Sequence, residues 1–389
     1  MYPNLYYAFK DLFGVELSGL KLVNSFGFFV AISFILSAWI LTLELRRKQQ
    51  QGLFLHTEET ITIGAKASLS ELLINFLIGF VFGYKIVGAF TISDALNDPQ
   101  SFILSSKGNL PVGLLVGLAF GALKWWEKNK EKLAKPETRT LRIWPQDRVG
   151  DIVIYAALFG FLGAKIFHNL ENWNDFVKDP IGSLVSFSGL TFYGGLICAG
   201  IAVLYYARKK NIKIVHLLDA MAPTMMFAYA FGRVGCQVSG DGDWGIVNLN
   251  PKPFSWLPDW MWAYHYPHNV VGEGVPISGC SGQFCNQLPI PVYPTPFYEI
   301  VICMVLFLVI WFIRKRIKVP GQLFGLYLIF NGVERFFVEK IRVNTKYDFL
   351  PFHPTQAEII SLLLVIAGVL MLIKSEKWFG NNNKQNSSL

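Results

Sequence analysis

The sequence predicts an all-α fold: a polytopic transmembrane helical bundle of about nine spans with one long extracytoplasmic loop. Hydrophobic residues make up 52% and charged residues 16% of the 389 residues, and the mean hydropathy is +0.38. A soluble protein of this length is less apolar. Apolar runs recur at about the 17 to 25 residues that a helix needs to cross a bilayer. Clusters of lysine and arginine follow alternate runs, as expected for cytoplasmic loops.

The apolar runs place the spans along the chain. We expect helices near residues 21–45, 69–92, 110–126, 150–169, 188–207, 214–231, 297–314, 321–340 and 357–373. The first residues lack a basic stretch, and the first run is long enough to span by itself, so we expect no cleavable signal peptide. Residues 1–20 are aromatic and weakly amphipathic, which favours an interfacial helix outside the membrane.

Lysine and arginine are distributed unevenly between the loops. With nine spans, the basic clusters all fall on one side: Arg46–Lys48, Lys124–Arg148, Arg208–Lys210, Arg314–Lys318, and Lys374 with Lys377. The opposite loops, near 93–109, 170–187 and 246–296, are poor in both residues. The positive-inside rule therefore predicts an outer N-terminus and a cytoplasmic C-terminus. The same bias accounts for the net charge of +8, so nucleic acid is not an expected partner.

A two-helix unit is repeated in the first half of the chain. Gly83–Lys85 corresponds to Gly163–Lys165 at a separation near 80 residues, and each copy continues into an outer loop with Asp98-Pro99 or Asp179-Pro180. The lysine of each copy either extends to lipid headgroups, which we favour, or helps to collect anionic lipid. We interpret the first copy as a structural addition. The predicted parts are an outer segment (1–20), a first span with the added helix pair and a basic cytoplasmic linker (21–149), a transmembrane bundle (150–373) and a cytoplasmic tail (374–389).

The segment after the sixth apolar run is dense in glycine and charge. That run ends at Phe231, and the chain then reads Gly232-Arg233-Val234-Gly235-Cys236-Gln237-Val238-Ser239-Gly240-Asp241-Gly242-Asp243-Trp244-Gly245. Arg233 is expected at the edge of the lipid, where a charge is costly and indicates a functional site. The glycines allow the backbone to approach a ligand closely or to adopt positive φ. The alternative is an arginine that extends to headgroups beside an ordinary loop.

A second charged group lies in the eighth span. Arg335 and Glu339 are four residues apart, and Arg342 follows three residues later, so all three are expected on one helical face. The group is either a structural ion pair or an anion clamp with its orienting carboxylate. Because Arg233 is expected at the same outer depth, we favour the clamp. In the sixth span, Asp219 needs a partner, and Pro223 permits a bend.

The expected arrangement suits phosphate chemistry. A guanidinium stays charged and offers a planar fork of donors to phosphate oxygens. Asp241, Asp243, Glu339 and Tyr193 are candidate proton acceptors and donors. The chain contains no Gly-x-Ser-x-Gly elbow and no P-loop sequence. These features favour group transfer on a phospholipid over nucleotide hydrolysis.

The five cysteines divide by location. Cys198 and Cys303 lie in apolar spans and are expected in the core, and Cys236 belongs to the glycine-rich segment. Cys280 and Cys285 lie in the long outer loop, where an oxidising exterior would allow a disulfide. No zinc-site pattern accompanies them, so we expect neither a metal nor a cofactor.

Several motifs together resemble the bacterial prolipoprotein diacylglyceryl transferase family. Asp219–Pro223, followed by Gly232–Gly235 and Gly240-Asp241, is similar to the family signature. Tyr193-Gly194-Gly195 resembles its His-Gly-Gly motif, Pro296–Glu299 the motif that opens the next span, and Gly332–Arg342 its arginine and glutamate helix. The resemblance is expected over about 150–373, with residues 50–130 outside it.

The resemblance implies an activity and a set of site residues. The activity is transfer of the diacylglyceryl group of phosphatidylglycerol to the lipobox cysteine thiol of a prelipoprotein in the bacterial inner membrane, which forms a thioether and releases glycerol phosphate. The implied catalytic residues are Arg233, Arg335, Tyr193, Asp241 and Glu339. The implied substrate-binding residues are Gly194, Gly195, Gly232, Gly235, Cys236, Ser239, Gly240, Asp243, Arg342 and Glu299. Tyr193 stands where the family has histidine, and Cys236 and Ser239 where it has asparagines, so the general base stays open.

Two other functions remain as alternatives. A non-enzymatic lipid carrier or scaffold on the same helices would keep the arginines but would not need the acids at Asp241, Asp243 and Glu339. An acyltransferase that uses phospholipid esters would need a His-Asp pair or a serine nucleophile, and none is evident in the sequence.

Overall fold

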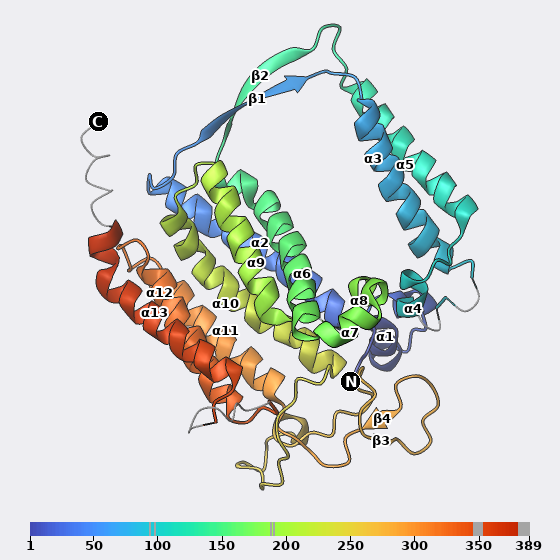
Figure 1. Cartoon of the computed structure of the whole chain (residues 1–389), viewed down its shortest axis with the longest axis vertical. Coiled ribbons are helices and arrows are strands. Elements are labelled where there is room, and N and C mark those ends of the chain that lie inside the picture. The colour runs from blue at the N-terminus through green and yellow to red at the C-terminus, as the bar shows by residue number, and fades with distance from the viewer. Residues whose placement is uncertain (93–94, 97–98, 187–188, 190, 345–352, 380–389) are drawn as a thin grey trace. The chain divides into compact units, whose positions relative to one another are not determined.

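The computed structural model describes residues 1–92, 95–96, 99–186, 189, 191–344 and 353–379. The chain folds into two compact units. The first unit comprises Met1–Leu12, Val23–Phe54 and Ile212–Leu389, and the second comprises Phe13–Leu22 and Leu55–Asn211. Figure 1 labels the helices and strands of both units.

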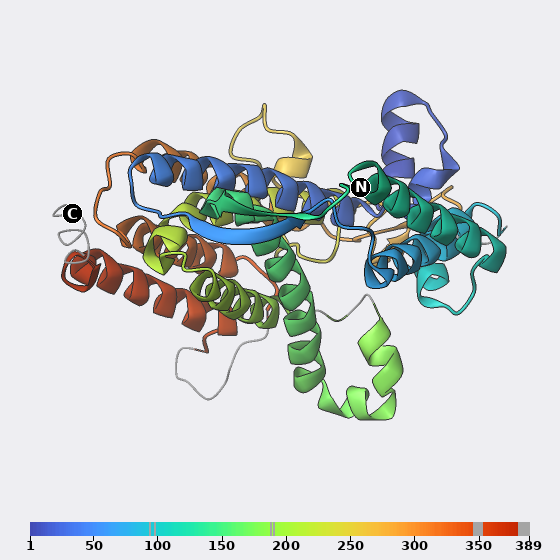
Figure 2. The ribbon, with the colours of Figure 1, turned by 90° about the horizontal axis from the view of Figure 1, so that it is seen from above.

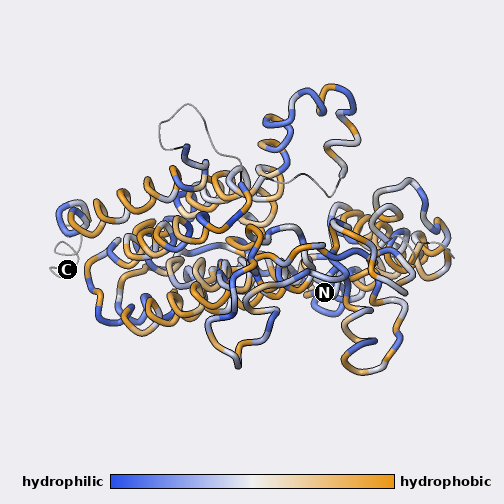
Figure 3. Tube along the Cα trace, turned by 90° about the horizontal axis from the view of Figure 1, so that it is seen from below, coloured by the Kyte–Doolittle hydropathy of each residue, from blue (hydrophilic) through white to orange (hydrophobic). Residues whose placement is uncertain are grey.

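The first unit is a helical bundle with a folded loop. Its helices are α1 (Leu5–Phe13), α2 (Ser25–Gln50), α10 (Ile214–Ser239), α11 (Thr295–Ile313), α12 (Gln322–Glu339) and α13 (Gln356–Phe379), and its strands are β3 (Val275–Pro276) and β4 (Asn286–Gln287). Helix α10 packs against α2 and α11, and α12 packs against α13 along its length (Figure 1). Apolar residues occupy most of each long helix, and hydrophilic residues gather in the loops (Figure 3).

Small residues allow α12 and α13 to approach closely. A Cβ at Gly325 would lie 2.9 Å from the carbonyl oxygen of Gly368, and one at Gly332 would lie 2.6 Å from the carbonyl oxygen of Ser361. Membrane helices commonly pack through such small residues because lipid supplies little hydrophobic drive for association. The core beside them contains Met226 of α10 and Cys303 and Ile310 of α11, all fully buried.

Asp219 finds the partners that its place in an apolar span requires. Its carboxylate accepts hydrogen bonds from the backbone amides of Gly321 (3.0 Å) and Phe324 (3.1 Å), at the start of α12. The ammonium of Lys48 lies 3.4 Å away. The first amides of a helix have no partner within it, and the positive end of its dipole favours an anion. Asp219 of α10 therefore fixes where α12 begins.

The second unit contains two helical hairpins and a strand pair. Its helices are α3 (Leu69–Val81), α4 (Pro99–Leu104), α5 (Leu110–Lys130), α6 (Val149–Glu171), α7 (Trp173–Lys178), α8 (Pro180–Val185) and α9 (Phe192–Lys209), with a π-helix (Phe82–Val87) after α3. Helix α3 packs against α5, and α6 against α9. Strands β1 (Thr57–Ile63) and β2 (Glu137–Ile143) pair antiparallel from Thr57↔Ile143 to Ile63↔Glu137 (Figure 2).

The two hairpins share the features that indicated a repeat. In the first, the Lys85 ammonium donates to the carbonyl oxygens of Phe102 (3.2 Å) and Lys107 (2.7 Å). In the second, the Lys165 ammonium donates to the carbonyl and hydroxyl oxygens of Ser186 at 2.9 and 2.8 Å, and Lys165 is 4% exposed. The expectation that these lysines extend to headgroups is therefore wrong for Lys165. Pro99 opens α4 as Pro180 opens α8, whereas Asp98 lies outside the described residues.

A glycine brings the two helices of the second hairpin together, which gives a first prediction. A Cβ at Gly163 would lie 2.4 Å from Cβ of Cys198 and 2.6 Å from the carbonyl oxygen of Gly194. Gly163→Ala should therefore destabilise the hairpin by about 1–3 kcal/mol, the usual cost of overpacking. Gly150→Ala on the same helix is the matched control, because a Cβ there meets nothing within 4 Å. Thermal unfolding in detergent should show a lower midpoint for Gly163→Ala alone; equal midpoints would contradict this packing.

Several boundaries differ from those expected. Among the described residues, seven helices are long and apolar enough to cross a membrane: Ser25–Gln50, Leu69–Val87, Leu110–Lys130, Pro145–Glu171, Ile214–Ser239, Thr295–Ile313 and Gln356–Phe379. The chain is thus a polytopic helical membrane protein. The other two expected spans correspond to α9 and α12, of 18 residues each; α12 carries Glu334, Arg335 and Glu339. The two strand pairs were not expected, because β1 and β2 are charged and polar strands without a strong apolar pattern, and β3 and β4 are only two residues long.

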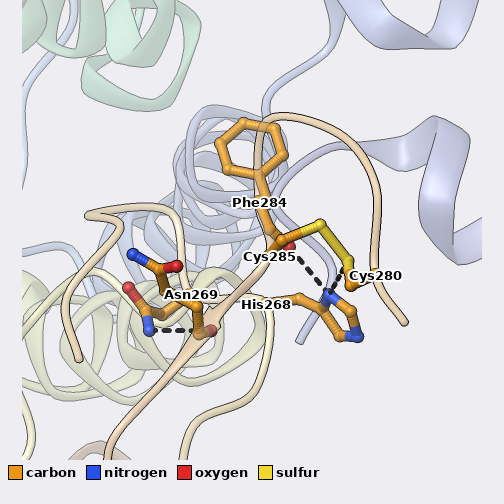
Figure 4. The surroundings of a disulfide bond; sticks show 6 residues. His268, Asn269, Cys280, Phe284 and Cys285 are labelled. Carbon is orange, nitrogen blue, oxygen red and sulfur yellow. Dashed lines mark hydrogen bonds between the residues drawn. A yellow bond between two sulfur atoms is a disulfide. The ribbon is translucent and has the colours of Figure 1, made fainter. Parts of the chain in front are cut away.

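The loop between α10 and α11 is folded against itself. Trp244, Tyr266, Leu288 and Val292 form a small core, and the Asn269 side-chain amide donates to the carbonyls of Tyr266 (3.2 Å) and Glu273 (3.0 Å). Cys280 and Cys285 are joined by a disulfide beside His268 (Figure 4). The Nδ1 atom of His268 lies 2.7 Å from the carbonyl oxygen of Phe284. The loop therefore returns the chain to α11 as a compact segment.

Candidate active site

Three helix ends of the first unit meet at the base of this loop. Arg233 lies near the C-terminus of α10, Glu299 near the N-terminus of α11, and Arg335 near the C-terminus of α12. The helix dipole favours cations at a C-terminus and anions at an N-terminus, so each charge lies at the end that stabilises it. The span expected to end at Phe231 continues as α10 to Ser239, so the first part of the glycine-rich segment, residues 232–239, forms the last turns of that helix.

Glu299 joins the three arginines. Its carboxylate oxygens lie 2.9 Å from Nε of Arg233, 3.1 Å from Nη1 of Arg335 and 3.5 Å from Nη1 of Arg342. The Tyr229 hydroxyl donates to the same carboxylate at 2.9 Å. The Glu299 side chain is fully buried, whereas the arginine side chains keep between 10% and 18% of their surface exposed. A buried carboxylate is stable only when paired, so Glu299 and the arginines depend on each other.

Asp243 makes a second bridge. Its carboxylate pairs with Nη1 of Arg233 and with Nη2 of Arg342, the latter at 2.8 Å. The Thr295 hydroxyl donates to the Asp243 carbonyl at 2.6 Å and so ties this turn to the start of α11. These contacts position Arg342, which follows the end of α12 at Glu339. The expectation that Arg335, Glu339 and Arg342 share one helical face is therefore wrong for Arg342, because the helix stops first.

Arg335 forms ion pairs with two carboxylates, those of Glu339 and Glu299. Its Nη2 lies 3.1 Å from Oε2 of Glu339, one turn away on α12, and its Nη1 faces Glu299. The Asn344 side-chain amide donates to Oε1 of Glu339 at 2.5 Å. The charges of the cluster balance, with three arginines against Glu299, Asp243 and Glu339. Because a guanidinium has five N–H donors, each arginine retains donors for an incoming anion.

The two aspartates after α10 differ in protonation behaviour. Burial raises the pKa of Asp241, and the neighbouring charge of Asp243 raises it further. Burial alone would raise the pKa of Asp243 as well, but the Arg233 and Arg342 guanidiniums outweigh it and hold that pKa below its ordinary value. Asp241 therefore accepts a proton more readily than Asp243.

One group of potential metal ligands occurs here among the described residues. The Cys236 sulfur and the carboxylates of Asp241 and Asp243 lie within 4.8 Å of one another. Both oxygens of Asp243 already accept from arginines, and a cation would be repelled by the same guanidiniums. The group is therefore poorly suited to a metal ion and better suited to binding an anion.

Comparison with known proteins places this arrangement in a family. The model of the prolipoprotein diacylglyceryl transferase family matches residues 110–374, which include every member of the charge cluster. The chain belongs to this family. It is an enzyme of the diacylglyceryl transferase class. The match begins in α5, so the resemblance expected from residue 150 starts earlier in the chain.

Curated relatives carry the same family name. The phosphatidylglycerol–prolipoprotein diacylglyceryl transferase of Staphylococcus haemolyticus is 28% identical over 229 residues, which cover 59% of this chain and 73% of the relative. That of Clostridium novyi is 28% identical over 230 residues, covering 59% and 80%. That of Lactobacillus acidophilus is 27% identical over 283 residues, covering 72% and 90%. The similarity thus extends over most of each relative.

The other expected site residues of this diacylglyceryl transferase near the end of α10 include glycines and Ser239. Gly240 and Gly242 have positive φ of 64° and 97° and let the chain turn out of α10. Gly232 and Gly235 are helical, and a Cβ at Gly235 would lie 3.1 Å from the Phe26 carbonyl oxygen of α2. Gly235 therefore allows α10 to pack closely against α2. Ser239 is fully buried, and its hydroxyl donates to the Gly235 carbonyl at 2.8 Å.

Cys236 and Tyr229 complete the surroundings of Arg233. Nη1 of Arg233 lies 3.7 Å from the Cys236 sulfur, and its guanidinium lies 5.2 Å from the centre of the Tyr229 ring. Tyr229 was not expected as a site residue. Its position one helical turn before Arg233 was the available sequence signal. Tyr193, Gly194 and Gly195 lie in the first turn of α9 in the second unit, and a Cβ at Gly194 would lie 2.3 Å from Cβ of Phe167.

Proposed function

We propose that this enzyme transfers the diacylglyceryl group of phosphatidylglycerol to the lipobox cysteine thiol of a prelipoprotein. The C–O bond between the glyceryl carbon and the phosphate breaks, and a C–S bond forms. The thiol proton passes to an acceptor, and glycerol phosphate leaves. The observation that carries the proposal is the set of three arginines held on Glu299 and Asp243 at the ends of membrane helices.

The arginines are suited to the phosphate of the donor. Arg233 and Arg335 are oriented by the same carboxylate, so their forks are fixed relative to each other. Fixed donors cost no reorganisation when negative charge develops on a leaving phosphate, which is the usual basis of large electrostatic effects in catalysis. Arg342 adds a third positive charge held on Asp243. We assign phosphate binding and leaving-group stabilisation to Arg233 and Arg335, with Arg342 in support.

Asp241 is the acid that we favour as proton acceptor. A thiol with an ordinary pKa of about 8.5 is mostly protonated at neutral pH, although the thiolate is the nucleophile. Asp243 and Glu339 are already bound by arginines, and the pKa of Asp243 lies below its ordinary value. The raised pKa of Asp241 makes it the better acceptor of the three. Because a phenol with a reference pKa of about 10 is a poor base, we assign to Tyr193 a hydrogen bond to the departing phosphate oxygen instead.

The membrane arrangement is part of the same proposal. We infer a bacterial inner-membrane location, nine spans including α9 and α12, an outer N-terminus and a cytoplasmic C-terminus. The support is the lysine and arginine distribution between loops. This orientation would place the arginine cluster at the outer face, where a lipobox cysteine arrives after export.

One assay tests the proposal against the alternative of a lipid carrier. Purified protein in detergent is mixed with phosphatidylglycerol labelled in its acyl chains and a lipobox peptide. We expect a thioether-linked diacylglyceryl peptide and a matching amount of glycerol phosphate. A carrier would bind the labelled lipid and yield neither product.

A comparison of variants tests the proton assignment. Tyr193→Phe should slow turnover without abolishing it, because a phenol keeps its proton up to about pH 10 and is a poor base at neutral pH. Tyr193→His should retain or raise activity. Asp241→Asn should be more damaging than Tyr193→Phe. Asp241 can accept the thiol proton only in its ionised form, and its pKa is raised. Wild-type turnover should therefore fall as the pH is lowered toward that pKa. Asp241→Asn should lack this fall in turnover at low pH, the acid limb of the pH profile.

The same assay includes Asp243→Asn and Glu339→Gln, each at two pH values. Asp243→Asn removes a charge that raises the pKa of Asp241, so its acid limb should move to lower pH. If Tyr193→Phe is inactive while all three acid variants turn over normally at both pH values, Tyr193 is the base and the assignment to Asp241 is wrong.

A further inference from the structure

An apolar groove of about 330 Å³ lies between α11 and α12. Its walls include Ile302 and Leu306 of α11 and Val333 and Phe337 of α12. Ile302, Val333 and Phe337 are 39%, 41% and 68% exposed. Exposed apolar side chains on helices of a membrane protein face lipid, so acyl chains have access to the groove.

One polar residue, Glu334, lines this groove. Glu334 is 4% exposed, and no N–H or O–H group of the described residues donates a hydrogen bond to either of its carboxyl oxygens. The thiol of Cys303, a weak donor, lies beside it. Buried polar groups almost always have partners, and an unpartnered one requires an explanation. A buried charge would be far more costly than the neutral acid, and the neutral acid presents one O–H donor.

The groove extends away from the arginine cluster. Glu334 directly precedes Arg335 on α12. On α11, Ile302 and Leu306 follow Glu299 by three and seven residues, which is about 4.5 and 10.5 Å along a helix. A phospholipid has the same order of groups, with the phosphate first, the ester carbonyls next and the acyl chains beyond them. A donor whose phosphate lies at Arg335 would thus have an ester near Glu334.

We propose that this groove holds one acyl chain of the phospholipid donor and that Glu334 donates a hydrogen bond to that chain's ester carbonyl oxygen. The proposal rests on the proposed function and deepens it, because it gives the site a means to select ester-linked over ether-linked lipids. Glu334 is then a specificity residue on the lipid side of the cluster. It takes no part in bond cleavage.

The hydrogen bond is tested with diacyl and dialkyl phosphatidylglycerol, which differ only in the ester carbonyls. For the wild type, the ether donor should have a KM about five-fold higher, the usual effect of losing one hydrogen bond. Glu334→Leu should raise the KM of the ester donor and show equal KM for both donors. Glu334→Gln keeps a neutral donor and should restore the preference. An equal ester preference in the wild type and Glu334→Leu would overturn the hydrogen bond.

The groove is tested with a bulky residue and a matched control. Ile302→Trp fills the groove and should raise the KM of a long-chain donor but not of a short-chain one. Val305→Trp, on the same helix and 54% exposed but outside the groove lining, should change neither. Equal effects of the two variants would refute an acyl-chain groove. No thioether product from the wild type with any donor would instead refute the proposed function.

Discussion

Arg335→Lys should lose most of its activity, with turnover lower by about 10²–10³-fold, the usual cost of removing one oriented donor to a developing anion. Lysine keeps the charge but presents a single ammonium, so it cannot reach Glu299 and Glu339 together while also donating to a phosphate. Arg233→Lys should behave in the same way, because Arg233 bridges Glu299 and Asp243. The measurement is turnover of purified protein with phosphatidylglycerol and a lipobox peptide.

Arg314→Lys is the matched control for this experiment. Arg314 is also mostly buried, with 10% of its side chain exposed, and its Nε lies 2.5 Å from Glu44 of α2. It follows the C-terminus of α11, whereas Glu299 lies at the N-terminus of that helix. Arg314→Lys should reduce stability without a comparable loss of turnover. Full turnover by Arg335→Lys would reduce Arg335 to a structural ion pair with Glu339.

Glu299→Gln should damage both stability and activity. Removing one partner of a buried ion pair typically costs about 3–5 kcal/mol, and here the loss would leave Arg233, Arg335 and Arg342 facing one another around an amide. The mutual repulsion of the three guanidinium groups would move them apart. We expect a large drop in the thermal midpoint and, in the protein that remains folded, a fall in kcat greater than the change in KM.

Glu44→Gln separates the two effects of Glu299→Gln. Glu44 has 1% of its side chain exposed and pairs with Arg47 and Arg314, so its loss also breaks a buried ion pair of the same unit. The two variants should therefore have similar thermal midpoints, whereas only Glu299→Gln should lose kcat. Normal turnover by folded Glu299→Gln would show that the shared carboxylate does not position the arginines.

The sequence predicted the arginines better than it predicted what holds them. Arg233, Arg335 and Glu339 could be identified because charge within an apolar run is conspicuous, and the pair at four-residue spacing lies on one helical turn. Glu299 was expected only as a substrate-binding residue. Its contacts join helices separated by tens of residues, and no local pattern encodes such a meeting.

The errors in helix ends have a common cause. The sixth span was expected to end at Phe231, before Gly232 and Gly235, but tertiary packing overrode the weak helix preference of glycine, and Gly235 lets α10 approach α2. Arg342 was placed on α12 by continuing the helical period, although the backbone there bridges Gly245 instead. Hydropathy located the spans, whereas packing decided where they end.

Helix α10 is connected to α12 by polar contacts near both of its ends. Asp219 binds the first amides of α12, and fourteen residues later on α10 Arg233 shares Glu299 with Arg335 near the other end of α12. Along a helix that separation is about 21 Å, a large part of the hydrocarbon thickness. When bilayer thickness changes, membrane helices adapt by tilting. Because they are fastened at two depths, α10 and α12 must tilt together, so the spacing between Arg233 and Arg335 should be insensitive to the length of the surrounding lipids.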